Sequence, residues 1–81
     1  MKSKPMEFKE WLLKRHLGRD TRIGDLARDV RDDHHFPDTD DVFEMYDYIH
    51  NLSGSCRGAL IALLEAYVKW SDYYDDFWGK N

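Results

Sequence analysis

One uninterrupted apolar stripe with helical spacing dominates the last third of this 81-residue chain. Its members lie on one face of a single helix from about Ser55 to Asp76, and they are Ala59, Leu60, Leu63, Leu64, Tyr67, Trp70 and Tyr74. At about 1.5 Å per residue such a helix is roughly 30 Å long, which is the full width of so small a domain. The rest of the chain must therefore pack against this helix, and its length allows one domain only.

Three shorter segments with the same helical spacing precede this helix. The first runs from about residue 5 to 17 and stops at Gly18. The second covers about residues 21–32, and the third about 40–50, where Asn51 can close the helix in the left-handed conformation. The pattern predicts four helices and no strand.

Polar residues stand where the middle two helices begin. Asp20 and Thr21 are suitable N-caps for the second helix. Asp38, Thr39 and Asp40 compete to cap the third, after Pro37 has turned the chain. A short connector, residues 53–55, then leads into the last helix.

The predicted fold is all-α, a compact four-helix domain with a long C-terminal helix. It covers residues 1–81, with the folded part at about 6–74 and an aromatic and acidic tail at 73–81. The apolar stripes predict a core of Phe8, Trp11, Leu12, Leu26, Val30, Phe36, Phe43, Tyr46, Ile49, Leu60, Leu63, Leu64, Tyr67 and Trp70.

Composition excludes several classes of protein. The single cysteine excludes an intramolecular disulfide framework. The longest apolar run, Ala59 to Leu64, is six residues and too short to span a membrane. Residues 1–5 carry charge with no apolar stretch behind them, unlike a secretory signal. We therefore expect a cytoplasmic protein that has no contact with membranes.

Charge is distributed unevenly along the sequence. Residues 1–31 contain nine Lys and Arg against five Asp and Glu, whereas residues 32–81 contain three against eleven. The basic part suggests nucleic-acid binding around the turn between the first two helices, through Lys14, Arg15, Arg19 and Arg22. Aspartates interleaved with the arginines of the second helix would weaken binding to phosphate, so we rank this function second.

The segment 32–41 contains five aspartates and two histidines, which are residue types that bind divalent cations. Their order matches neither a calcium loop nor a pair of zinc-binding histidines on a helix. The same aspartates are suited to capping helices, with Phe36 tucked into the core. We expect no metal site and no cofactor.

No set of residues supplies a nucleophile, a base and an oxyanion donor together, so we expect no enzyme. Cys56, with His50 six positions earlier, is the one conceivable nucleophile pair. A small, partly buried cysteine is the interpretation that we favour.

Several short motifs together resemble the YozE-like family of small bacterial proteins. They are Phe8-x-x-Trp11-Leu12, Asp25-Leu26-Ala27-x-Asp29, Asp33-x-x-Phe36-Pro37, Tyr48-Ile49 and a closing Trp70. The resemblance covers nearly all of residues 6–74 and implies a SAM-like (sterile-alpha-motif-like) helical domain. It implies no catalytic or binding residue, because the function of the family is largely uncharacterised. The aromatic and acidic tail departs from the family pattern.

The surface favours a small non-enzymatic module that binds a protein partner, since aromatic residues are enriched at interfaces. The expected contacts are four acidic and three aromatic residues: Asp40, Asp41, Glu44, Asp47, Tyr73, Phe77 and Trp78. Two further alternatives use the same charges. One is an acidic inhibitor that mimics phosphate on a nucleic-acid-binding protein, and the other is head-to-tail self-association of the basic and acidic parts.

Overall fold

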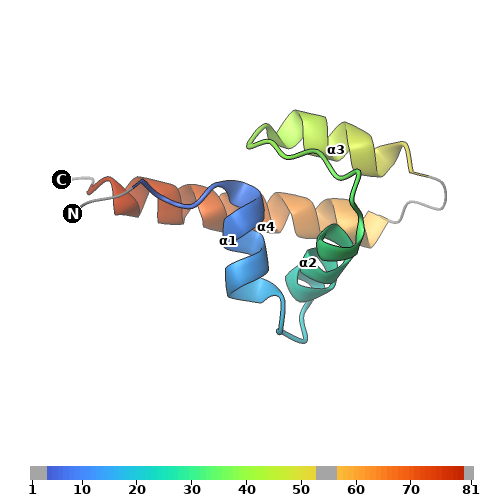
Figure 1. Cartoon of the computed structure of the whole chain (residues 1–81), viewed down its shortest axis with the longest axis horizontal. Coiled ribbons are helices and arrows are strands. Elements are labelled where there is room, and N and C mark those ends of the chain that lie inside the picture. Colours follow the sequence, from blue (N-terminus) through green and yellow to red (C-terminus); the bar gives the residue numbers. More distant parts are fainter. Residues whose placement is uncertain (1–3, 53–56, 80–81) are drawn as a thin grey trace.

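Helix α4 (Arg57–Phe77) forms the axis of the molecule, and the three shorter helices pack around it (Figure 1). The structure is a computed structural model that describes residues 4–52 and 57–79. In the view of Figure 1, α1 (Phe8–His16) and α2 (Arg22–Asp32) lie mostly below α4, and α3 (Val42–His50) lies above it. No strand occurs in the described ranges, which confirms the all-α, four-helix fold with its long last helix.

Helix α3 contacts α4 but, over the parts of the chain that the structure describes, neither α1 nor α2. The four helices nevertheless bury one continuous core, to which α4 contributes a single stripe of Ala62, Leu63, Ala66 and Trp70. The predicted connector at residues 53–55, the start of the last helix at Ser55, and Cys56 lie outside the described residues. None of the described helices combines the length and apolar character needed to cross a membrane.

The first helix begins later than predicted, because residues 4–7 are extended and lie against α4. The backbone N–H of Met6 donates to the Tyr73 hydroxyl at 2.7 Å, and the Trp70 indole N–H donates to the Met6 carbonyl at 2.9 Å. Glu7 has an extended backbone (φ −70°, ψ 165°) and precedes the first helical residue. Pro5 suits a helix start and an extended chain equally, so local sequence did not separate the two.

The caps of α2 and α3 were predicted with mixed success. The Thr21 hydroxyl accepts from the Gly24 N–H at 3.0 Å, as expected. Helix α3 is capped by Asp41, whose carboxylate accepts from the Phe43 N–H at 2.9 Å, one position after the predicted candidates. Asn51 has φ −90°, so the predicted left-handed ending is wrong: its backbone still follows the helical turn.

The hydrophobic core differs from the predicted set mainly in α3 and α4. Its buried residues are Phe8, Trp11, Leu12, Ile23, Leu26, Ala27, Val30, Phe36, Met45, Ile49, Ala62, Leu63, Ala66 and Trp70. Tyr46, Leu60 and Tyr67 are half-buried around it. Two predicted core residues, Phe43 and Leu64, are exposed instead, at 78% and 47% of their surface.

The reason is the rotation of each helix about its own axis. Helix α3 turns Met45 and Ile49 towards α4, which directs Phe43 outwards. Helix α4 turns Ala62, Leu63 and Ala66 inwards, and Leu64 lies about 100° further round the axis. Small alanines at the contact allow close approach of the helices, which a search for large apolar residues overlooks.

Candidate functional site

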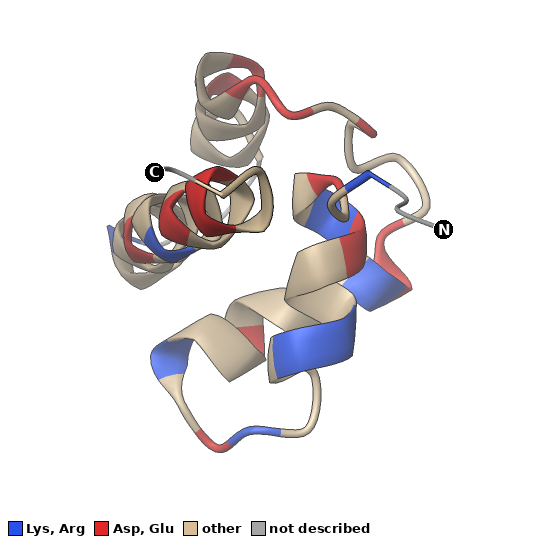
Figure 2. Cartoon of the chain, turned by 90° about the vertical axis from the view of Figure 1, so that its left-hand side faces the viewer, with Lys and Arg blue, Asp and Glu red and all other residues tan. Residues whose placement is uncertain are grey.

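Charge is unevenly distributed among the helices. From Asp32 through Cys56 the sequence has seven Asp and Glu and no Lys or Arg. This stretch includes α3 and the loop that leads to it from the end of α2 (Figure 1). In the view along α4, acidic segments mark α3 and its loop, and most basic segments lie on α1, α2 and their connection (Figure 2).

An exposed apolar surface runs along the seam between α3 and α4. A depression of about 220 Å³ there is lined by Val42, Phe43, Tyr46 and Leu64. Ile61 and Val68, at 39% and 62% exposure, extend it along α4, because positions 61, 64 and 68 share one side of a helix. We call Phe43, Ile61, Leu64 and Val68 the α3–α4 apolar face.

Acidic side chains border this face on α3. Glu44 and Asp47 are exposed, and Asp47 lies one turn after Phe43 on the same side of the helix. Asp41 is exposed as well and caps α3. The structure therefore exposes three of the four predicted acidic contacts on α3 and at its start. Two residues of the neighbouring apolar face, Phe43 and Leu64, had been predicted to lie in the core.

Asp40, the fourth predicted acidic contact, is engaged within the fold. Its carboxylate Oδ1 accepts from the backbone N–H of Phe8 at 2.8 Å, and its carbonyl accepts from the Tyr67 hydroxyl at 2.7 Å. Burial, together with the negative charges of Asp40 and Asp41, raises the pKa of Tyr67. Asp40 thus ties the α2–α3 loop to the start of α1 and to α4.

The predicted aromatic contacts divide into one structural residue and two at the end of α4. Tyr73 is half-buried, and its hydroxyl accepts a hydrogen bond from the Met6 N–H. The guanidinium carbon of Arg15 lies 5.3 Å from the centre of the Tyr73 ring. Phe77 is half-buried, whereas Trp78 is 55% exposed, and their ring centres are 5.4 Å apart. Trp78 is therefore the most exposed of the three.

The basic residues predicted for nucleic-acid binding are partly engaged too. Lys14 lies 3.5 Å from the Glu10 carboxylate, and Arg22 lies 3.1 Å from that of Glu65. Arg19 donates through Nε to the Arg15 carbonyl at 3.1 Å.

Lys69 of α4 lines the same surface depression as Arg19 and Arg22. Sequence reasoning missed it, because Lys69 lies in the acidic part of the chain, far from the two arginines along the sequence. Only the packing of α2 against α4 brings these three side chains together.

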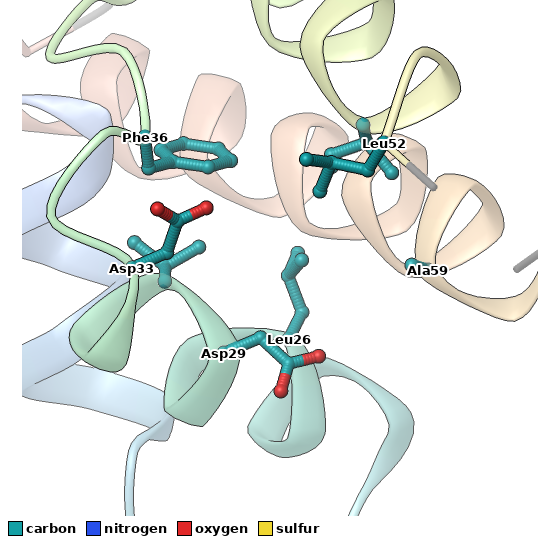
Figure 3. Close-up of a pocket in the computed structure, with 8 residues that line it drawn as sticks. Leu26, Asp29, Asp33, Phe36, Leu52 and Ala59 are labelled. Carbon is teal, nitrogen blue, oxygen red and sulfur yellow. The ribbon is translucent and has the colours of Figure 1, made fainter. Parts of the chain in front are cut away.

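A small cavity of about 60 Å³ lies between α2, the loop after it, α3 and α4 (Figure 3). Phe36 and Leu52 face Leu26 across it, and the carboxylates of Asp29 and Asp33 lie on the α2 side. This volume is well below the roughly 300–1,000 Å³ of sites that take up drug-sized ligands.

Asp33 beside this cavity is held by the Tyr48 hydroxyl, which donates to Oδ2 at 2.6 Å, and by the His35 N–H, which donates to Oδ1 at 2.9 Å. These two hydrogen bonds, the Tyr48 bond foremost, lower the pKa of Asp33, and the same bond raises the pKa of Tyr48. Within the described ranges, no three His, Cys, Asp or Glu side chains are grouped so that they could hold a metal ion. The aspartates of segment 32–41 that form hydrogen bonds thus organise the loop and the helix ends.

Comparison with known proteins gives one match. The family model described as YozE SAM-like fold matches residues 8–75, which include the four helices up to the last turn of α4. No curated protein and no solved structure matches the chain.

Proposed function

The chain belongs to the YozE SAM-like family, and we propose that this member is a small non-enzymatic interaction module that binds a protein partner through the α3–α4 apolar face. The observation that carries the proposal is the exposure of Phe43, Ile61, Leu64 and Val68 together in one region of so small a chain. Contiguous exposed apolar residues with a polar rim mark sites of protein interaction. One cysteine in 81 residues agrees with the bacterial cytoplasm as its compartment.

Charge at the rim indicates what kind of partner fits. Glu44 and Asp47 are exposed beside Phe43, in a stretch of sequence without Lys or Arg. Complementary potentials guide encounters and fix the register of an interface, while apolar anchors supply most of the affinity. We therefore expect the partner to present apolar side chains flanked by Lys or Arg.

Trp78 remains a second anchor in this proposal, at the C-terminal end of α4. Asp40 and Tyr73 also remain candidates, but both hold the extended segment or the start of α1 in place. A substitution at either residue therefore changes the stability of the fold together with any contact to a partner. Glu44, Asp47, Leu64 and Trp78 are the better positions for testing binding.

The nucleic-acid alternative finds less support, because Asp25 and Asp29 lie among the arginines of α2 and would weaken binding to a phosphate backbone. The phosphate-mimic alternative uses the same acidic side chains as the main proposal but needs no apolar contact. It therefore predicts that Glu44 and Asp47 matter and that Leu64 does not.

The test is capture of partners from a bacterial lysate by the tagged full chain, with and without nuclease, followed by direct binding of the purified partner. We expect a nuclease-resistant partner whose affinity falls at least about tenfold for Leu64→Asp, as for loss of an interface anchor. The matched control is Arg31→Asp, at the far end of α2 from Arg22, which should bind normally.

Three results would contradict the proposal: retention that is lost on nuclease treatment, affinity that Leu64→Asp leaves unchanged, or no partner at all. Loss of affinity in Glu44→Lys and Asp47→Lys, with Leu64→Asp unaffected, would support the phosphate mimic instead. Circular dichroism of each variant separates lost binding from lost folding.

A further inference from the structure

Three positively charged side chains from separate parts of the chain surround one surface depression. It has a volume of about 280 Å³ and lies where the α1–α2 turn meets α4. Arg19 comes from the turn, Arg22 from the first residue of α2, and Lys69 from α4, and His16 lines the same depression. Glu65 is the one carboxylate among the residues that line it.

The side chains around the depression are arranged to receive an anion. Arg19 uses Nε to bond the Arg15 carbonyl, and no described residue bonds its two terminal nitrogens. Arg22 reaches across to α4, where its terminal nitrogen lies 3.1 Å from Glu65 Oε2. Glu65, the only carboxylate that lines the depression, thus pairs with Arg22. Among the ion pairs of the described residues, neither Arg19 nor Lys69 has a carboxylate partner.

The lowered pKa of His16 agrees with this crowding of positive charge. Burial lowers the pKa of His16, and the charges of Arg19, Lys69 and Arg15 lower it further. These cations act on the imidazole from both the α1–α2 turn and α4. Like charges held together in this way favour a bound anion, which relieves their mutual repulsion.

We propose that this depression binds the phosphate group of a small phosphorylated compound, held by Arg19, Arg22 and Lys69. Guanidinium groups match the geometry of phosphate with paired N–H donors, and lysine adds a point charge. Glu65 competes with the ligand for Arg22, so a bound phosphate replaces the Arg22–Glu65 contact. The volume leaves room for the phosphate and a small group attached to it.

The inference is independent of the proposed function. None of its residues belongs to the α3–α4 apolar face, so either can fail while the other stands. Phosphate in a nucleic-acid backbone shares the same chemistry, and the test must therefore separate these two sources.

The test is titration of the full chain with inorganic phosphate and pyrophosphate at constant ionic strength, followed by amide and imidazole NMR signals. We expect saturable shifts centred on His16, Arg19 and Lys69. Arg19→Gln and Lys69→Gln should each weaken binding about tenfold, as for loss of one charged hydrogen bond. Arg31→Gln and Lys9→Gln make the same charge change outside the depression and should leave the affinity unchanged.

Glu65→Gln gives the sharpest result, because removing the competing carboxylate should tighten binding severalfold. Glu10→Gln, which removes a carboxylate paired with Lys14 instead, is its control and should have no effect. The proposal is overturned if phosphate and pyrophosphate cause no saturable shift, or if the control variants weaken binding as much as Arg19→Gln does. It is also overturned if a single-stranded oligonucleotide binds here and the two small anions do not.

Discussion

The carboxylate of Asp40 caps helix α1 from the α2–α3 loop, accepting the backbone N–H of Phe8 at 2.8 Å across 32 positions of sequence. Glu7, the residue at the N-cap position of α1, makes no side-chain cap of its own. The start of α1 therefore depends on the loop that connects α2 to α3. Because Asp40 is used in this way, the next residue, Asp41, is the one that caps α3.

Replacing Asp40 with alanine should lower the free energy of unfolding by about 1 kcal/mol, the usual effect of losing an N-cap. Asp38→Ala removes an exposed carboxylate from the same loop and should change it by less than about 0.5 kcal/mol. Urea denaturation followed by circular dichroism measures both variants. Equal stability of the two variants would show that Asp40 does not cap α1.

Gly24 and Gly18 should respond in opposite ways to substitution by alanine. A Cβ at Gly24 would overlap the Arg19 carbonyl oxygen and come within 3.1 Å of that of His16, both backbone atoms of the α1–α2 turn. Gly24→Ala should therefore cost about 1–3 kcal/mol of unfolding free energy or more, as overpacking does.

A Cβ at Gly18 would meet nothing within 4 Å, and the backbone there is not left-handed. Gly18→Ala should be neutral or stabilising by about 0.4–1 kcal/mol, through a smaller entropy of the unfolded chain. The melting temperatures of the two variants test this expectation. A destabilised Gly18→Ala together with a tolerated Gly24→Ala would contradict this packing of the turn.

Leu63 and Leu64 are neighbours in sequence with opposite environments, fully buried and 47% exposed. Leu63→Ala should cost about 2–5 kcal/mol, because it leaves a cavity in the core. Leu64→Ala should cost less than about 1 kcal/mol, since the site is already open to solvent. Comparable losses in the two variants would mean that the α3–α4 apolar face is covered in the folded monomer.

Stability at acid pH should depend on the Tyr48–Asp33 hydrogen bond. Asp33 has a lowered pKa in the folded chain, so its contribution to stability is complete above the ordinary aspartate value of 3.8. That contribution disappears as the pH falls through the lowered pKa. Tyr48→Phe should therefore destabilise the fold near neutral pH, and the part of its effect due to this pKa shift should vanish in acid.

Denaturant unfolding at a series of pH values tests this expectation. Tyr46→Phe is the control, because the Tyr46 ring stacks on His50 and not on Asp33. The change in unfolding free energy that it causes should not vary with the protonation of Asp33. A Tyr48→Phe effect of constant size from neutral pH to below the pKa of Asp33 would exclude the linkage.

Local patterns determined the four helices, the end of α4 to within a residue and the Thr21 cap, because each depends on residues within one or two turns. The resemblance in the motifs also held, since the family model matches residues 8–75. The residues buried in α1, Phe8, Trp11 and Leu12, were predicted correctly, because they follow the i, i+3, i+4 spacing of one helix face.

Tertiary structure alone decided which side of α3 and α4 faces inwards. The apolar residues of α4 extend around most of its circumference, so the pattern leaves its rotation open. Packing against α1, α2 and α3 selects Leu63 for the core and leaves Leu64 outside.

Contacts between positions that are distant in the chain could not be predicted from the sequence either. The cap from Asp40 to Phe8, the bond from Met6 to Tyr73 and the approach of Lys69 to Arg19 all join residues that are far apart in the chain. Residue type and spacing specify how a segment folds on itself. Which segments then meet depends on how the helices pack, and in this protein both candidate sites lie where helices meet.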